Sequence, residues 1–183
     1  LRGLVILPGE LLHFDAGRPK TVEAIKAAMQ EDSVVFLSSQ IDVRKNEISR
    51  EDIYSVGTVC RIRQLLRIPG DSIRVLAEGL ERAEAGAFAQ EEPYFRGEIH
   101  RLEEPDYDPM MAEALHRRVS ERFDSFCAIS GRVTVDTRMN IEEMTHPGEY
   151  ADAVAEQAIQ KMEDKQRVLE AVEKQSDAAM DRT

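Results

Sequence analysis

The sequence predicts an α+β protein in which a β-rich module is followed by a helical bundle. Residues 1–105 contain short runs rich in Val, Ile and Leu that are separated by Gly and Pro, a pattern typical of strands. Residues 106–183 instead place apolar residues three and four positions apart, which is typical of amphipathic helices. Of the 183 residues, 42% are hydrophobic and 32% charged, as in a globular protein rather than a disordered one. We therefore predict two subdomains, residues 1–105 and 106–183.

Six strands and one interrupting helix are predicted for residues 1–105. The strands are expected at Leu4–Leu7, Val34–Ser38, Gly57–Ile68, Ile73–Ala77, Arg82–Ala89 and Tyr94–Leu102. A Pro-Gly-Asp sequence at 69–71 separates the third run from the fourth, and because Pro fixes φ and Gly tolerates a positive φ, these two runs should form a hairpin. Thr21 is predicted to cap the helix, because Val22, Ile25 and Met29 follow it at helical spacing.

Three helices are predicted after residue 105. The first should begin near Pro109 and end at Gly131, with an inward face made of Met111, Leu115, Val119, Phe123 and Phe126. A short helix should follow Thr134. The third should begin at Glu149, with Ala151, Val154, Ala158, Ile159 and Met162 facing inward. The chain does not open with Met, and its last helical run reaches Thr183 without a cap, so we expect both ends to lie inside a longer protein.

Charge and missing motifs argue against several classes of function. The chain has 35 acidic and 24 basic residues, a net charge of −11, which would repel nucleic acids and anionic membranes. It has no Gly-Lys-Ser/Thr phosphate loop and no GxGxxG motif, so we expect no cofactor in this chain. The four histidines accompany no nucleophile motif, and Cys60 and Cys127 are expected to be buried thiols, so neither catalysis nor metal binding is predicted. A cytoplasmic location is expected.

The methionines of the helical part leave two interpretations open. They are Met110, Met111, Met139, Met144 and Met162. Flexible thioether side chains can form an adaptable surface for varied apolar ligands, but they also fill gaps in cores. Helical spacing favours the core interpretation over the binding surface.

Three segments resemble, in order, the amino-terminal domain of the Lon protease family. The first covers residues 1–29, the second is a long hairpin at 53–85, and the third lies in the helical part. The matching positions are Leu1, Arg2, Pro8, Gly9, Gly17, Arg18, Ala24, Val56–Val59, Pro69, Gly70, Glu78, Gly79, Leu80, Arg82, Pro147, Gly148, Ala151, Asp152, Lys165, Gln166, Leu169 and Glu170. The chain departs from the family at His13, where a proline is usual.

The resemblance implies a PUA-like β module followed by a helical extension. It also implies a parent that is an ATP-dependent serine protease, a homo-oligomeric (hexameric) ring with an AAA+ motor that uses ATP and Mg and a Ser-Lys protease domain, neither of which this chain contains. The implied role of this region is non-catalytic: it recognises or holds unfolded and damaged proteins and helps the oligomer to assemble. Two alternatives stay open, a free-standing protein-binding module and a PUA-type RNA binder.

Leu11, Leu12 and Phe14 are the predicted substrate contacts. They follow the turn at Pro8 and Gly9 rather than lying in a clear alternating strand, so their side chains could form an apolar surface. The alternative is that all three belong to the core.

Overall fold

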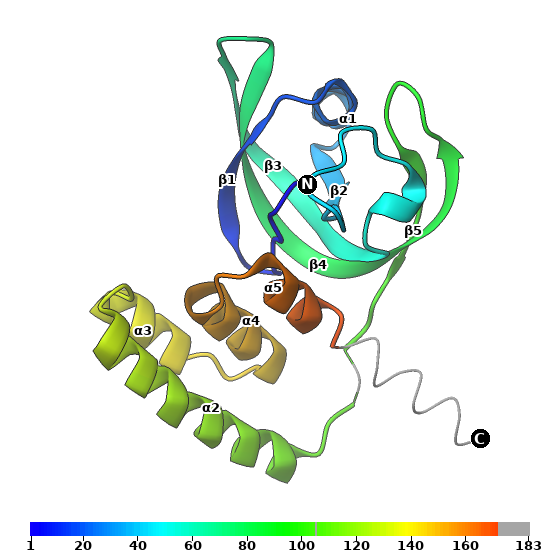
Figure 1. Cartoon of the computed structure of the whole chain (residues 1–183). Coiled ribbons are helices and arrows are strands. Elements are labelled where there is room, and N and C mark those ends of the chain that lie inside the picture. The colour runs from blue at the N-terminus through cyan, green and yellow to red at the C-terminus, as the bar shows by residue number, and fades with distance from the viewer. Residues whose placement is uncertain (105, 172–183) are drawn as a thin grey trace, which may run out of the picture. The chain divides into compact units, whose positions relative to one another are not determined.

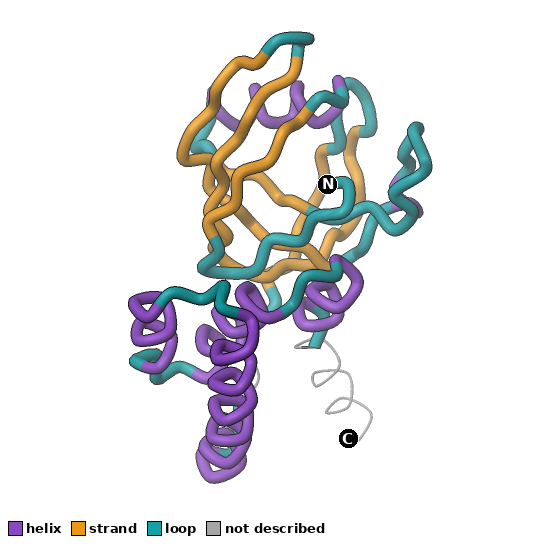
Figure 2. Tube along the Cα trace, turned by 60° about the vertical axis from the view of Figure 1, so that its left-hand side comes forward, coloured by secondary structure: helices purple, strands orange, loops and turns teal. Residues whose placement is uncertain are grey.

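The computed structural model describes residues 1–104 and 106–171, and the chain divides into two compact units. The first unit spans Leu1–Leu102 and the second begins at Glu103, three residues before the predicted boundary. All strands of the described residues lie in the first unit, and the second unit is helical (Figures 1 and 2). The structure therefore confirms the α+β class.

The first unit is organised around an antiparallel sheet of five strands. Its elements are β1 (Leu11–Ala16), α1 (Pro19–Gln30), β2 (Val34–Leu37), the 3₁₀ turn η1 (Arg50–Asp52), β3 (Val56–Ile68), β4 (Ser72–Gln90) and β5 (Arg96–Arg101). The strands lie in the order β1-β4-β3-β2, and β5 pairs with the C-terminal part of β4. The 19-residue β4 thus pairs with three other strands, and it is the central element of the sheet.

The hairpin predicted at residues 69–71 is confirmed, and it joins β3 to β4. Gly70 has a φ of 86° and Asp71 a φ of 56°, left-handed conformations that Gly and Asp tolerate better than other residues. The two runs predicted at Ile73–Ala77 and Arg82–Ala89 are parts of the single strand β4. Gly79, which interrupts the apolar pattern between them, is paired within the sheet.

The amino-terminal segment differs from the prediction. Leu4–Leu7 is not a strand, although Val5, Ile6 and Leu7 are buried. Two of its backbone groups bond to side chains instead of to a neighbouring strand: the Thr58 hydroxyl donates to the Ile6 carbonyl at 2.6 Å, and the Leu7 N–H donates to the Glu10 carboxylate at 2.9 Å. The apolar run at Leu4–Leu7 therefore indicates burial but does not indicate a strand.

The segment that follows is a strand that the prediction missed. In β1, Leu12, Phe14 and Ala16 face the core while Leu11, His13 and Asp15 are exposed. The alternation is hidden in the sequence because one outward position carries a leucine. The next helix, α1, begins at Pro19, since proline suits the first helical position, so Thr21 lies inside the helix and is not its cap as predicted.

The core of the first unit lies between the sheet and α1. Val22 and Ile25 from α1 pack against residues of β1, β3 and β4, whereas Met29 is exposed. The core cluster consists of Ile6, Phe14, Ala16, Val22, Ile25, Leu37, Cys60, Ile62, Ile73, Val75 and Ala77. Outside it, Lys20 of α1 contacts the β4–β5 hairpin, with its Nζ 2.6 Å from the Glu92 carboxylate and 4.9 Å from the centre of the Phe95 ring.

The second unit contains four helices among its described residues: α2 (Pro109–Ser130), α3 (Val135–Glu142), α4 (Pro147–Ala158) and α5 (Met162–Leu169). The predicted ends of α2 are confirmed by its caps. The Asp108 carboxylate accepts a hydrogen bond from the Met110 N–H at 3.0 Å, and Gly131 closes the helix with a φ of 61°. The small core is formed by Phe123, Ile141 and Tyr150.

The third predicted helix is in fact two. Its predicted inward face is correct at Met162, which is buried, and at Val154, which packs against the helical core. α4 ends at Ala158 and α5 begins at Met162. In α4, Tyr150, Asp152 and Ala155 are buried, whereas the predicted Ala151 is exposed. The polar run predicted to continue from α5 to Thr183 lies outside the described residues beyond position 171.

Replacing Thr134 with alanine should destabilise the second unit by about 1 kcal/mol, the usual cost of losing a side-chain N-cap. The Thr134 hydroxyl caps α3 by accepting a hydrogen bond from the Thr137 N–H at 3.1 Å. Urea unfolding followed by circular dichroism measures the change. Thr134→Ser keeps the hydroxyl and should retain most of the stability, and equal losses in both variants would contradict the capping role.

Candidate functional site

Metal-ligand clusters and reactive thiols are two kinds of chemical site that the described residues allow us to test. No group of three or more His, Cys, Asp or Glu within residues 1–104 and 106–171 is placed to hold a metal ion. Burial raises the pKa of the Cys60 thiol to about 12, so it stays protonated at neutral pH. Cys127 is only partly buried, contrary to the prediction, and burial raises its pKa as well. Neither thiol is therefore suited to act as a nucleophile.

The three predicted contact residues occupy three different environments. Leu11 is exposed, Leu12 is half-buried against the core, and Phe14 is a core residue with 5% exposure. Only Leu11 offers a free apolar surface. Phe14 also lines a surface depression of about 610 Å³, together with Leu4, His13, Asp15 and Arg74.

Polar groups line one side of this depression and already satisfy each other. The Arg74 guanidinium donates two hydrogen bonds to the Asp15 carboxylate, at 2.7 and 2.9 Å. This pairing lowers the pKa of Asp15 and raises that of Arg74, so both groups stay charged. Because each charge is neutralised by the other, the depression offers little to an ionic ligand.

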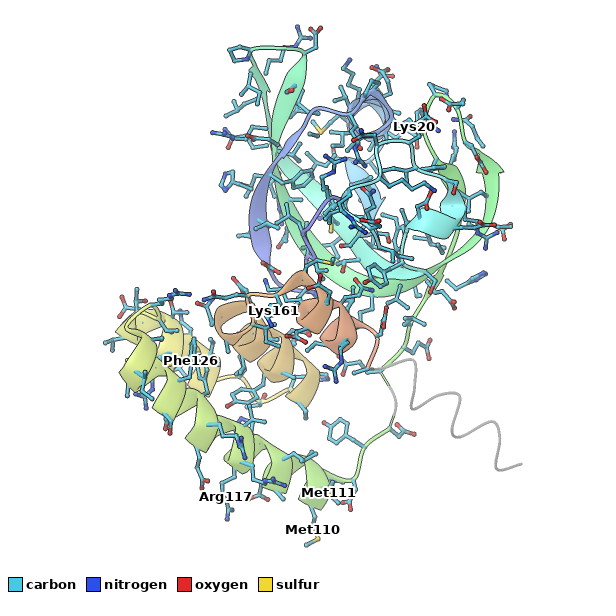
Figure 3. All side chains as sticks on the ribbon, in the orientation of Figure 1. Lys20, Met110, Met111, Arg117, Phe126 and Lys161 are labelled. Atoms are coloured by element: carbon cyan, nitrogen blue, oxygen red, sulfur yellow. The ribbon has the colours of Figure 1, made fainter. Side chains whose placement is uncertain are left out.

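Among the described residues, α2 carries several exposed apolar side chains in one row. Met111, Leu115 and Val119 are 58%, 50% and 37% exposed, and their spacing of four residues places them on one face of the helix. We refer to these three residues as the α2 stripe. Met110, at 81% exposure, lies beside its first member, and both methionines project from the first turn of α2 in Figure 3.

The α2 stripe lies beside, and not within, the packed face of the helix. The packed side chains include His116, Phe123 and Cys127. Tyr150 of α4 sets this orientation: its ring centre lies 4.0 Å from that of His116, and its hydroxyl is hydrogen-bonded to Ser120. Burial of this ring raises the pKa of Tyr150.

The predicted inward face of α2 is therefore correct only at its C-terminal end, where Phe123 is buried and Phe126 packs beside it. The core interpretation of the methionines is also wrong for Met110, Met111 and Met139, which are exposed. It holds for Met162, which is buried, and for Met144, which packs against the core. The binding-surface interpretation is thus the better one for the amino-terminal end of α2.

The comparison with protein families decides the identity of this chain. Residues 1–176 match the model of the ATP-dependent protease La (LON) substrate-binding domain. The chain belongs to the Lon substrate-binding domain family. The match confirms the resemblance that residues 1–29, 53–85 and the helical motifs predict.

Relatives of this Lon domain are similar over nearly all of its length. It is 40% identical over 174 residues to a Lon protease of Clostridium acetobutylicum, covering 94% of the chain and 22% of that relative. It is 38% identical to Lon protease 1 of Bacillus subtilis, covering 93% of the chain and 22% of the relative. The chain therefore spans about a fifth of the length of these curated relatives.

The solved structures confirm the fold of the Lon domain. The N-terminal domain of Mycobacterium avium complex Lon protease superposes with a TM-score of 0.71 at 19% identity, covering 92% of this chain and 86% of that structure. The comparisons give no support to the RNA-binding alternative. No helix among residues 1–104 and 106–171 combines the length and apolar character that a membrane crossing requires.

Proposed function

We propose that this domain is the non-catalytic region of an ATP-dependent Lon protease that holds unfolded or damaged proteins through the α2 stripe. The observation that carries this proposal is the exposure of Met111, Leu115 and Val119 in one row. Unfolded chains differ from folded ones chiefly in exposing apolar side chains, so a receptor for them needs an exposed apolar surface of its own. Methionine suits this task because its flexible thioether adapts to varied shapes.

Leu11 is a second contact in this proposal. It projects from β1 with 58% exposure, and β1 is fixed to β4 along its whole length. Leu12 and Phe14 support this strand from the core side. Two separate apolar surfaces on one domain would let a long unfolded chain bind at two points, which strengthens binding through effective concentration.

The remaining functions of a Lon protease are proposed to lie outside this chain. They are ATP and Mg use, serine-protease chemistry and the completed hexameric ring, in a cytoplasmic protein. The relatives are about five times longer than the matched part, which leaves room for such domains. A contribution of this domain to assembly is part of the proposal, and a free-standing module remains the alternative.

A fluorescence titration tests the binding proposal. The chain is titrated with a labelled protein in two forms, native and permanently unfolded. Saturable binding of the unfolded form alone is the expected result. The double variant Met111→Ser, Leu115→Ser should bind about tenfold more weakly, because removing part of two apolar contacts costs about 1.4 kcal/mol. Its thermal midpoint should stay unchanged, since both side chains are exposed.

Leu66→Ser is the matched control, because Leu66 has the same 50% exposure as Leu115 but lies on β3. Leu11→Ser measures the second surface separately. Failure of the unfolded form to bind the wild-type chain would refute the proposal. Equal losses in the Leu66 variant and the double variant would refute the assignment to α2.

A further inference from the structure

Two arginines lie on the same side of α2 as the apolar residues. Arg118 follows Leu115 by three positions and Arg122 follows Val119 by three, so each is a surface neighbour of the α2 stripe. Both side chains are exposed. Glu113 lies about 160° around the helix from Leu115, at about 100° per residue. Glu121 follows Arg118 by three positions, but it lies on the side of Arg118 that faces away from the α2 stripe, about 120° from Leu115.

These two arginines are not neutralised within the described part of the chain. Arg117, on another face of α2, is 3.6 Å from Glu113, and Arg138 of α3 lies 2.8 Å from both Asp124 and Glu142. By contrast, neither Arg118 nor Arg122 forms an ion pair or hydrogen bond with any residue of 1–104 or 106–171. In a chain with 35 acidic and 24 basic residues, two unpaired cations beside an apolar row form a local positive field.

We propose that the α2 stripe, with Arg118 and Arg122, selects segments that form an amphipathic helix with acidic residues beside its apolar ones. This inference rests on the proposed function and names the class of segment that the surface prefers. A helix docked on α2 would bury its apolar row against Met111, Leu115 and Val119. Carboxylates flanking that row would then lie within reach of the two guanidinium groups, which bind carboxylates in a fixed fork geometry.

The overall charge of −11 does not oppose this preference at close range. At about 0.15 M salt the screening length is about 8 Å, so a bound segment experiences mainly the charges beside it. Two exposed ion pairs together predict a preference of about twofold to thirtyfold. Parallel pairing of α2 from two copies of the chain is disfavoured, because it would place like-charged arginines together.

Two labelled peptides of about 18 residues test the inference. Both carry leucines at helical spacing; one has glutamate and the other lysine at the flanking positions. The wild-type chain should bind the acidic peptide about fivefold more tightly, and the difference should shrink with added salt. The variant Arg118→Glu, Arg122→Glu should prefer the basic peptide.

Arg67→Glu, Arg96→Glu is the matched control, because it changes the net charge equally at two exposed arginines of the first unit. The control should keep the preference for the acidic peptide. Equal binding of both peptides by the wild type would overturn the inference, and so would a reversal in the control variant. The titration with the permanently unfolded protein separates the two proposals. If the wild type binds both peptides equally but still binds the unfolded protein, only the inference fails. If it does not bind the unfolded protein, the proposed function and the inference both fail.

Sedimentation velocity tests whether a second copy of the chain covers the α2 stripe. A wild-type dimer that dissociates on Leu115→Ser would identify the α2 stripe as an interface between copies and overturn the inference. A monomer in both samples is the expected result.

Discussion

Replacing Gly79 with alanine is expected to lower the free energy of unfolding of the first unit by about 3 kcal/mol, at the upper end of the usual cost of overpacking a core. Gly79 lies in β4, and a Cβ at this position would be placed directly against the carbonyl oxygen of Leu7. That carbonyl belongs to backbone, so no side-chain rotation can relieve the contact.

The Leu7 backbone cannot retreat easily, because the residues that follow it are hydrogen-bonded to Gly79 itself. The Gly9 N–H donates to the Gly79 carbonyl at 2.9 Å, and the Gly79 N–H donates to the Glu10 carbonyl at 2.9 Å. Leu7 itself is fully buried. A shift large enough to admit a methyl group would break these hydrogen bonds or open the core.

Gly86→Ala provides the comparison within the same strand. A Cβ there would meet the Nε2 atom of His100 at 2.7 Å, but that imidazole ends an exposed side chain that can rotate away. Its cost should therefore stay below about 1 kcal/mol, as for other surface positions. Urea unfolding monitored by circular dichroism measures both variants, and a similar loss in the two would contradict the role assigned to the Leu7 carbonyl.

Local signals in the sequence predicted the elements that local chemistry determines. The turn at Pro69-Gly70, the start of α2 near Pro109, its end at Gly131 and a short helix after Thr134 are predicted from the sequence and confirmed by the structure. In each case a residue within a few positions satisfies or terminates the backbone on its own. Such signals do not depend on what packs against the element.

The elements that depend on distant residues were not predictable in this way. Leu4–Leu7 has the composition of a strand but its backbone bonds to the side chains of Thr58 and Glu10, which only the fold brings near. The register of α2 is a second example. Its apolar residues indicate one face, yet Tyr150 packs on His116 and Ser120, one position further along.

The candidate site results from the difference between the predicted and the observed packed face of α2. Once Tyr150 fixes the packed face of α2, the residues that the sequence assigned to the core at Met111, Leu115 and Val119 are left exposed. An apolar row that folding does not use remains available for binding. The sequence contained the residues of this surface, but its orientation depends on a contact between two helices.

Replacing Phe123 with alanine is expected to destabilise the second unit by about 4 kcal/mol, the usual cost of removing a buried phenylalanine ring. Phe123 is 3% exposed and shares a core cluster with only Ile141 and Tyr150 among the buried described residues. Phe126 stacks beside it, with ring centres 6.3 Å apart. A core this small cannot repack around the cavity that the substitution leaves. Most of the stability of the helical unit should therefore be lost.

The loss should be confined to the helical unit, because all residues of the cluster around Phe123 belong to that unit. Limited digestion with trypsin, followed by mass spectrometry, measures this: Phe123→Ala should be cleaved rapidly after Arg117, Arg118 and Arg122, while fragments ending near Arg101 persist. Ile129→Ala, on the same helix at 87% exposure, should digest like the wild type. Equally rapid cleavage of both units in the Phe123 variant would show that the two cores unfold together.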